Sequence, residues 1–189
     1  MTHDDSKLLV PVYDGLTYLN IDDGTDADVV GFVLQSVSEM FDAYTDRKLL
    51  AGDYVEYLKG DGTSTIYVRN YPLNSTSETI DVRVDSDREF GADTQISDVW
   101  VDENIGAIVR TNGRFVTGRP IRVSYNGGYT AVPHDLQLAA LTMMTVMYKE
   151  RSEKNFSLTS QGRGENNWQY LDNLPHKVRE TLRRYKRYG

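Results

Sequence analysis

The sequence predicts an α+β fold in which a group of short antiparallel strands is inserted between two helices. Three observations predict it: apolar residues recur every three or four positions up to about residue 46, they alternate with polar residues between residues 53 and 125, and an almost wholly apolar segment follows Pro133. With 189 residues, 39% of them hydrophobic, the chain can bury one good core or one core with a small appended layer.

The first helix is expected to begin near the acidic run of residues 22–28 and to end near Asp46. Thr25 is a candidate cap, and the acidic side chains suit the positive end of a helix dipole. The apolar stripe that follows consists of Val29, Phe32, Val33, Val37, Met40, Phe41 and Tyr44. Asp46 occupies the position where a glycine often ends a helix.

Five or six short strands are expected between residues 53 and 125. Residues 54–59 and 65–69 flank Gly60-Asp61-Gly62, which predicts a hairpin. Residues 80–84 alternate in polarity, residues 99–102 and 107–110 form a second expected hairpin, and residues 121–125 complete the set. Tyr71-Pro72 is expected to end the second strand, and residues 85–97 are polar and predict a long loop.

The second helix starts at Pro133, which fits the first helical position, with Asp135 in the first turn. Between Leu136 and Tyr148 only Gln137, Thr142 and Thr145 are polar. A helix that is apolar nearly all round is either central in a core or shared with a neighbouring subunit, and the sequence leaves both alternatives open. Three pliable methionines on this helix are candidate subunit-interface residues: Met143, Met144 and Met147.

The C-terminal part of the chain is expected to hold a flexible linker and a last helix. Residues 155–167 are rich in serine, glycine and asparagine, which favours a linker. Trp168 and Tyr170 follow it and complete the expected subunit interface. Pro175 opens a helix whose apolar stripe consists of Val178, Leu182 and Tyr185.

The charge is unevenly distributed. The net charge is −7, yet residues 175–189 contain six basic residues and one acidic residue, a local balance of +5, so the remaining residues carry −12. An acidic body argues against wrapping DNA or RNA. The basic tail is either an ordinary solvated helix face or a binding surface. A module that contacts nucleic acid or membrane through this tail is the alternative function.

Catalytic, metal and cofactor sites are not predicted. There is no cysteine, so disulfides, thiolate metal sites and thiol nucleophiles are excluded. His3, His134 and His176 lack metal-ligand spacing, the acidic run does not fit a calcium loop, and the glycine pairs lack the lysine of a phosphate-binding loop. No apolar run is long enough to span a membrane, and no secretory signal is recognised at the first residues. We therefore expect a soluble, unsecreted protein that is not an enzyme.

Four short motifs occur in an order that resembles the head-tail connector (adaptor) proteins of tailed bacteriophages. They are A-Y-T-D-R-K-L at residues 43–49, Y-P-L at residues 71–73, the strand-to-helix junction of residues 125–136 with its Y-N-G-G-Y turn, and Y-K-E-R at residues 148–151. Asp46 stands where that family usually has glycine. No motif after Ser152 matches.

The resemblance implies a structural virion protein that forms a closed ring, typically of twelve copies, in the neck between the portal and the tail or the next neck protein. Double-stranded DNA would pass through its acidic channel without being read. The implied plan has an N-terminal segment with the first core helix (residues 1–52), a β insertion (53–128), a long apolar core helix (129–154) and a linker with a basic helix (155–189). The basic tail is expected to order on contact with the portal. Its candidate portal-binding residues are Lys177, Arg179, Arg183, Arg184, Tyr185, Arg187 and Tyr188.

Overall fold

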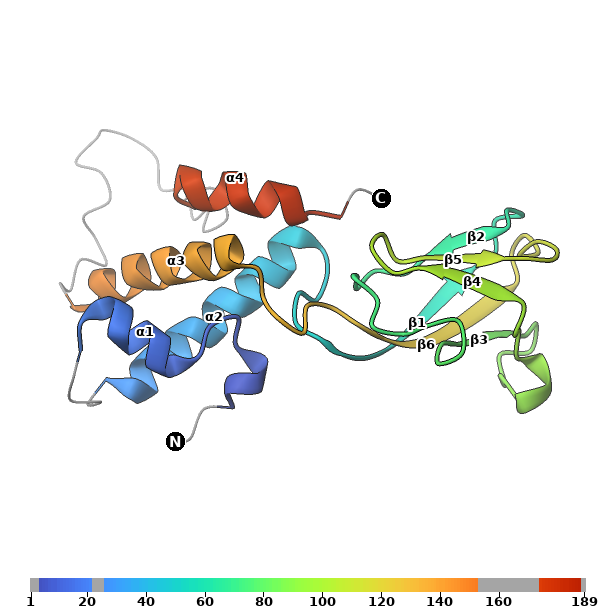
Figure 1. The fold of residues 1–189 in the computed structure, drawn as a ribbon, viewed down its shortest axis with the longest axis horizontal. Helices are drawn as coiled ribbons and strands as arrows, with labels where there is room; N and C mark the ends of the chain where they lie inside the picture. Colours follow the sequence, from blue (N-terminus) through green and yellow to red (C-terminus); the bar gives the residue numbers. More distant parts are fainter. Residues whose placement is uncertain (1–3, 22–25, 153–173, 188–189) are drawn as a thin grey trace. The chain divides into compact units, whose positions relative to one another are not determined.

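The computed structural model describes residues 4–21, 26–152 and 174–187. The chain divides into two compact units, a helical unit formed by residues 1–46 and 132–189 and a β unit formed by residues 47–131 (Figure 1). The β unit is thus inserted in the chain between two parts of the helical unit. The expected α+β class is confirmed: the described residues form four α-helices and six short antiparallel strands in two three-stranded sheets.

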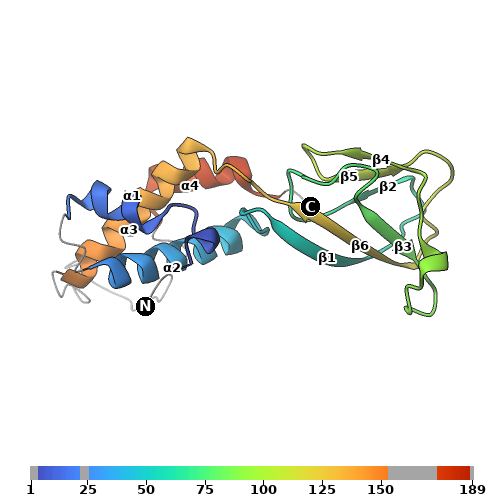
Figure 2. The same cartoon turned by 60° about the horizontal axis from the view of Figure 1, so that its bottom comes forward.

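The helical unit contains α1 (Val12–Leu19), α2 (Ala27–Thr45), α3 (His134–Ser152) and α4 (His176–Tyr185), preceded by a 3-10 turn, η1 (Asp5–Lys7). Helix α2 packs against α3, and α1 and α4 lie on opposite sides of α3 (Figures 1 and 2). The core side chains of this unit come from α2 (Val30, Leu34, Val37, Phe41), α3 (Leu136, Ala140, Met144) and α4 (Val178, Leu182). Helix α1 was not expected from the sequence.

The predicted ends of the long helices are close to the observed ones. Asp46 is the residue after the last turn of α2 and adopts the left-handed conformation with φ 56° and ψ 34°, as its glycine-like position indicated. Helix α3 begins at His134, directly after Pro133. At the start of α2, Asp26 makes no side-chain cap and instead accepts a hydrogen bond of 2.6 Å from the Tyr148 hydroxyl of α3. Thr25, the expected cap, lies outside the described residues.

The β unit contains β1 (Gly52–Lys59), β2 (Thr65–Tyr67), β3 (Asp81–Val84), β4 (Val99–Asp102), β5 (Ala107–Arg110) and β6 (Pro120–Gly127). The first sheet has the strand order β1-β6-β3 and the second the order β2-β5-β4, with all pairs antiparallel. The long loop between β3 and β4 contains a 3-10 turn, η2 (Ala92–Thr94).

One expected hairpin is confirmed and the other is wrong. Strands β4 and β5 pair as predicted around residues 103–106. Strands β1 and β2, in contrast, belong to different sheets: β1 pairs along its whole length with β6, from Gly52 opposite Gly127 to Lys59 opposite Pro120. The Gly60-Asp61-Gly62 turn therefore carries the chain from one sheet to the other, and Gly60 donates its backbone N–H to Arg119 rather than to β2.

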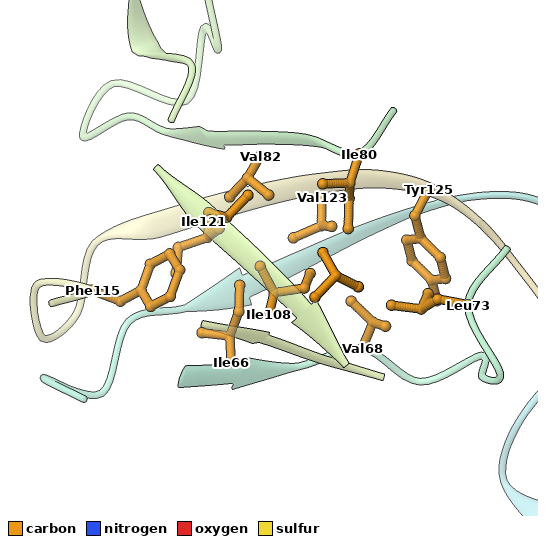
Figure 3. Packing of buried hydrophobic residues seen from close by; sticks show 12 residues of the cluster. Ile66, Val68, Leu73, Ile80, Val82, Ile108, Phe115, Ile121, Val123 and Tyr125 are labelled. Carbon is orange, nitrogen blue, oxygen red and sulfur yellow. The ribbon is translucent and has the colours of Figure 1, made fainter. Parts of the chain in front are cut away.

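The two sheets pack face to face over one apolar core. Figure 3 shows its members: Val82, Ile121 and Val123 of the first sheet lie opposite Ile66 and Ile108 of the second, and Phe115, Leu73 and Tyr125 close the ends. All these side chains are buried. The outward positions of each strand consequently form two further faces that point away from each other.

The glycine pair at the end of β6, Gly127-Gly128, forms a crowded turn, as predicted. A side chain at Gly127 would collide with the carbonyl oxygen of Asn70, and one at Gly128 with that of Leu50. Gly128 also has φ +94°, which a residue with a side chain rarely adopts. The turn thus packs backbone against backbone, and it leads through Tyr129 to the end of the β unit.

Candidate interaction surfaces

Three of the four motifs that carry the resemblance to phage connectors meet at a buried arginine. Arg47 is 4% exposed, although it is charged. Its guanidinium donates a hydrogen bond of 2.7 Å to the carbonyl oxygen of Tyr71, stacks on the Tyr71 ring at 4.0 Å and reaches the Tyr129 hydroxyl at 3.4 Å. Three motifs that are distant in the sequence therefore meet in one cluster of the β unit. Their role is to hold the base of the β unit together, since buried arginine is stable only when it is hydrogen-bonded.

The predicted basic tail is a folded helix in the structure. Val178 and Leu182 of α4 are buried against the helical unit, at 1% and 0% exposure. The Tyr185 hydroxyl donates a 2.5 Å hydrogen bond to Asp135 of α3, and the backbone N–H of Arg187 donates to the carbonyl oxygen of Thr45. The expectation of a tail that orders only on contact with a partner does not fit residues 176–185, which are already seated on α3 and α2.

Because Val178 and Leu182 face the core, the basic side chains of α4 and of the two residues that follow it form a basic face on the helical unit. The basic face consists of the exposed Lys177, Arg183, Arg184 and Lys186 together with the half-buried Arg179 and Arg187. Arg183 pairs with Glu180 at 2.7 Å and Arg184 with Asp135 at 3.3 Å, but both arginine side chains remain more than half exposed. Exposed ion pairs of this kind contribute little to stability, about 0–1 kcal/mol, so their arginines can exchange partners at small cost.

The methionines of α3 lie mostly inside the helical unit. Met144 is fully buried and Met143 is 8% exposed, whereas Met147 is half-buried. The exposed apolar residue of this helix is Leu138, at 55%. Of the other candidate interface residues, Trp168, Tyr170 and Tyr188 lie outside the described residues.

Sequence reasoning missed a set of exposed apolar side chains on the β unit. Tyr57 is 69% exposed, Val55 56%, Tyr67 55% and Trp100 54%. Strands generally favour aromatic residues, so a tyrosine in a strand does not by itself indicate an exposed surface. The alternation of β1 contained the missing signal, because Val55 and Tyr57 occupy its outward positions between the inward Tyr54, Glu56 and Leu58.

The described residues offer neither a cluster of metal ligands nor a helix that could span a membrane. Among residues 4–21, 26–152 and 174–187, no three histidine or acidic side chains are grouped so that they could hold a metal ion. No helix within these ranges is long and apolar enough to cross a membrane.

A family model described as head completion protein matches residues 9–188. The chain belongs to this family. Head completion proteins are structural proteins of phage-like virions, so the expected head-tail connector class is confirmed, and the chain is not an enzyme. No curated protein matches the sequence.

Solved structures with the same fold come from gene transfer agent (GTA) particles. One chain of the "neck of empty GTA particle computed with C6 symmetry" is 14% identical, with a TM-score of 0.66 over 100% of this chain and 94% of that one. A chain of the "virion of native gene transfer agent (GTA) particle" is 15% identical, with a TM-score of 0.61 over 96% and 91%. A chain of the "neck of native GTA particle computed with C12 symmetry" is 16% identical, with a TM-score of 0.59 over 100% and 93%.

Proposed function

We propose that this head completion protein forms a ring in the neck of a phage-like particle, where it joins the portal to the next neck or tail protein and lets double-stranded DNA pass. The observation that carries the proposal is the family match over residues 9–188, combined with a fold shared along nearly the whole chain with proteins of GTA necks. The acidic body of the chain suits a channel for DNA, because like charge keeps phosphates from adhering to the wall.

The proposed ring contains twelve copies. The similar GTA necks were computed with C12 and C6 symmetry. Twelve copies fit both symmetries, as twelve identical positions under C12 or as six identical pairs under C6. The subunit contacts expected from the sequence used Met143, Met144, Met147, Trp168 and Tyr170. Because Met144 and Met143 are buried in the helical unit itself, Met147 is the methionine best placed to reach a neighbour.

The basic face is the proposed contact with the portal. Arginine forms bidentate hydrogen bonds with carboxylates and is enriched where proteins bind each other. The buried Val178 and Leu182 fix α4 on the helical unit, so the backbone that carries its arginines is already ordered before a partner binds. Of the portal-binding residues predicted from the sequence, Lys177, Arg183 and Arg184 are exposed, and Tyr185, Arg187 and Tyr188 are proposed to border the contact.

Charge reversal on the basic face tests the portal contact. The double variant Arg183→Glu/Arg184→Glu should keep the fold, since both side chains are more than half exposed, and it should lose at least tenfold in affinity for the portal. The matched control is Arg88→Glu/Arg114→Glu, which reverses two exposed arginines of the β unit. Truncation before Pro175 is a poorer test, because it would uncover the core that Val178 and Leu182 fill.

Native mass spectrometry of the protein, alone and mixed with the portal, provides the measurement. The expected species is a portal-bound ring that the control variant retains and the basic-face variant loses. A chain that never assembles with the portal would exclude the proposed function. If the basic face instead binds DNA with an affinity that falls steeply with salt, the tail is a nucleic-acid contact and the portal contact lies elsewhere.

A further inference from the structure

The two outward faces of the β unit both expose large apolar side chains. On the first sheet, β1 directs Val55 and Tyr57 outward, and we call this the β1 face. On the second sheet, Tyr67 of β2 and Trp100 of β4 point outward on either side of β5, and we call this the Trp100 face. Because the two sheets share one core between them, these faces lie on opposite sides of a single compact unit (Figure 3).

The β1 face is supported by the long loop between β3 and β4. Phe90 of this loop is 6% exposed and lies against the outer side of the first sheet, with its ring 5.8 Å from the Tyr57 ring and 5.6 Å from the Arg122 guanidinium. Asp81 holds Arg83 at 2.9 Å and Arg122 at 3.2 Å on the same side. The Phe90 ring therefore supports the Tyr57 side chain, although Tyr57 is 69% exposed. A side chain that is held in place before binding loses less conformational freedom when a partner binds.

The Trp100 face is less charged than the β1 face. Trp100 lies opposite Val109, which in turn lies opposite Thr65, so one row of the second sheet is apolar or uncharged along its whole width. Asp102 is the single charged residue at the outward positions of β2, β4 and β5, whereas the outward positions of the first sheet contain Lys59, Arg83 and Arg122 against Asp53 and Asp81. The two faces thus carry opposite net charges of one unit each.

We propose that the β1 face of one copy packs against the Trp100 face of the next copy, and that this contact closes the ring. The inference rests on the proposed ring. In a cyclic ring every subunit presents two different surfaces that are complementary to each other. Tyrosine, tryptophan and arginine are the side chains that contribute most at interfaces, and here Tyr57 and Arg122 face outward on one side of the unit and Trp100 and Tyr67 on the other. A second copy therefore matches each face in apolar content and in charge.

The absence of cysteine makes the contact testable by crosslinking. Tyr57→Cys and Trp100→Cys are introduced into one full-length chain, the ring is assembled with the portal, and a short bis-maleimide is added. The expected result is a ladder of covalent oligomers on a denaturing gel. Each single variant alone should stay monomeric, and a mixture of the two single variants should stop at dimers, because head-to-tail contacts join unlike faces.

Two further variants keep the test decisive if Tyr57 and Trp100 are themselves needed for assembly. Val55→Cys/Tyr67→Cys retains both aromatic anchors and should give the same ladder. Ile105→Cys/Val116→Cys places thiols at loop residues of similar exposure, 52% and 55%, and should give at least tenfold less covalent oligomer.

The outcomes separate this inference from the proposed function. A ring that assembles by native mass spectrometry while neither interface pair forms a ladder overturns the β-unit contact and leaves the ring intact. Dimers from a single-cysteine variant alone would show that like faces meet and would also overturn it, as would an equal ladder from the loop control. If no ring forms with the portal, the proposed function fails and the inference fails with it.

Discussion

At the scale of single residues, a buried tyrosine holds a polar network in the β unit. The Tyr125 hydroxyl donates a hydrogen bond to the Glu56 carboxylate and accepts one of 3.0 Å from the backbone N–H of Asn70. Glu56 also accepts from the backbone N–H of Arg69 at 2.9 Å. Burial, and then the bond to Glu56, raise the pKa of the Tyr125 hydroxyl far above its ordinary value. The hydroxyl therefore remains a donor at any pH at which the protein is handled.

Replacing this hydroxyl should be costly. Tyr125→Phe leaves Glu56 and the Asn70 N–H each without one partner in a largely buried place, so the free energy of unfolding should fall by about 1–3 kcal/mol. Urea denaturation of the full chain gives the measurement. Tyr57→Phe, which removes a hydroxyl from an exposed ring, is the control and should change stability by less than about 0.5 kcal/mol. Equal effects of both substitutions would contradict the role of the network.

Asp46, the residue directly after α2, has a left-handed backbone conformation. Its left-handed conformation costs a residue with a side chain roughly 1 kcal/mol, and a β-branched residue more. Asp46→Gly should therefore be more stable than Asp46→Val by about 1–2 kcal/mol in thermal or urea unfolding. Both variants remove the same carboxylate, so the difference between their free energies of unfolding measures the cost of the left-handed backbone conformation. Ala43→Val, one turn earlier on an exposed position of α2, measures the ordinary cost of valine in this helix.

At the scale of elements, the sequence was most informative where the signal is local. Periodicity, Pro133, Pro175 and Asp46 placed α2, α3 and α4 to within a few residues. Helix α1 was missed because it is short and contains Gly15, a poor helix former. This glycine lets α1 approach α2, since a Cβ there would lie 2.9 Å from Val30.

The sequence predicted where the strands lie better than it predicted which strands pair. Alternation in β1 correctly indicates which side chains face the core, but it does not indicate which strand lies beside it. A glycine-rich turn between two strands favoured a hairpin, whereas β1 pairs along its whole length with β6, whose residues lie 61 to 75 positions later in the chain. The same limit applied to the surfaces: the charge pattern located the basic face, but the exposure of Tyr57 and Trp100 depends on which strands neighbour them.

The loop between β3 and β4 depends on one carboxylate. The Asp85 carboxylate accepts hydrogen bonds from the backbone N–H groups of Asp87, Glu89 and Phe90, at 3.0, 3.0 and 2.9 Å. These bonds, first that of Asp87, lower the pKa of Asp85 below its ordinary value of 3.8. A lowered pKa means that the carboxylate stabilises the folded loop above pH 3.8 and that this contribution is lost as the pH falls through the lowered value.

We expect Asp85→Asn to loosen the loop at neutral pH in the same way that acid loosens it in the unaltered chain. Hydrogen exchange at the amides of Glu89 and Phe90 should become faster in the variant, and protection in the unaltered chain should decline below pH 3.8. Asp87→Asn changes an exposed carboxylate of the same loop and should leave these amides protected. Unchanged protection of Phe90 in Asp85→Asn would show that other contacts fix the loop.

At the scale of the whole molecule, the β unit is continuous in sequence and has its own core. Residues 47–131 contain both sheets, the buried Arg47 with its partners Tyr71 and Tyr129, and the Tyr125 network. We expect this segment to fold when it is produced alone. Dispersed amide resonances and a cooperative unfolding transition would confirm it, whereas a collapsed or unfolded spectrum would show that the helical unit is needed for folding.

Backbone hydrogen bonds join the first and last residues of the β unit, and this affects how the insertion can vary in length. The backbone of Tyr129 donates to the carbonyl oxygen of Leu49 at 2.7 Å and accepts from the N–H of Ala51 at 3.1 Å. A segment whose two ends are joined in this way can lengthen, shorten or be exchanged as a cassette without altering the distance its flanking helices must span. Changes of length in the loops of this insertion are therefore expected to leave the fold of the helical unit intact.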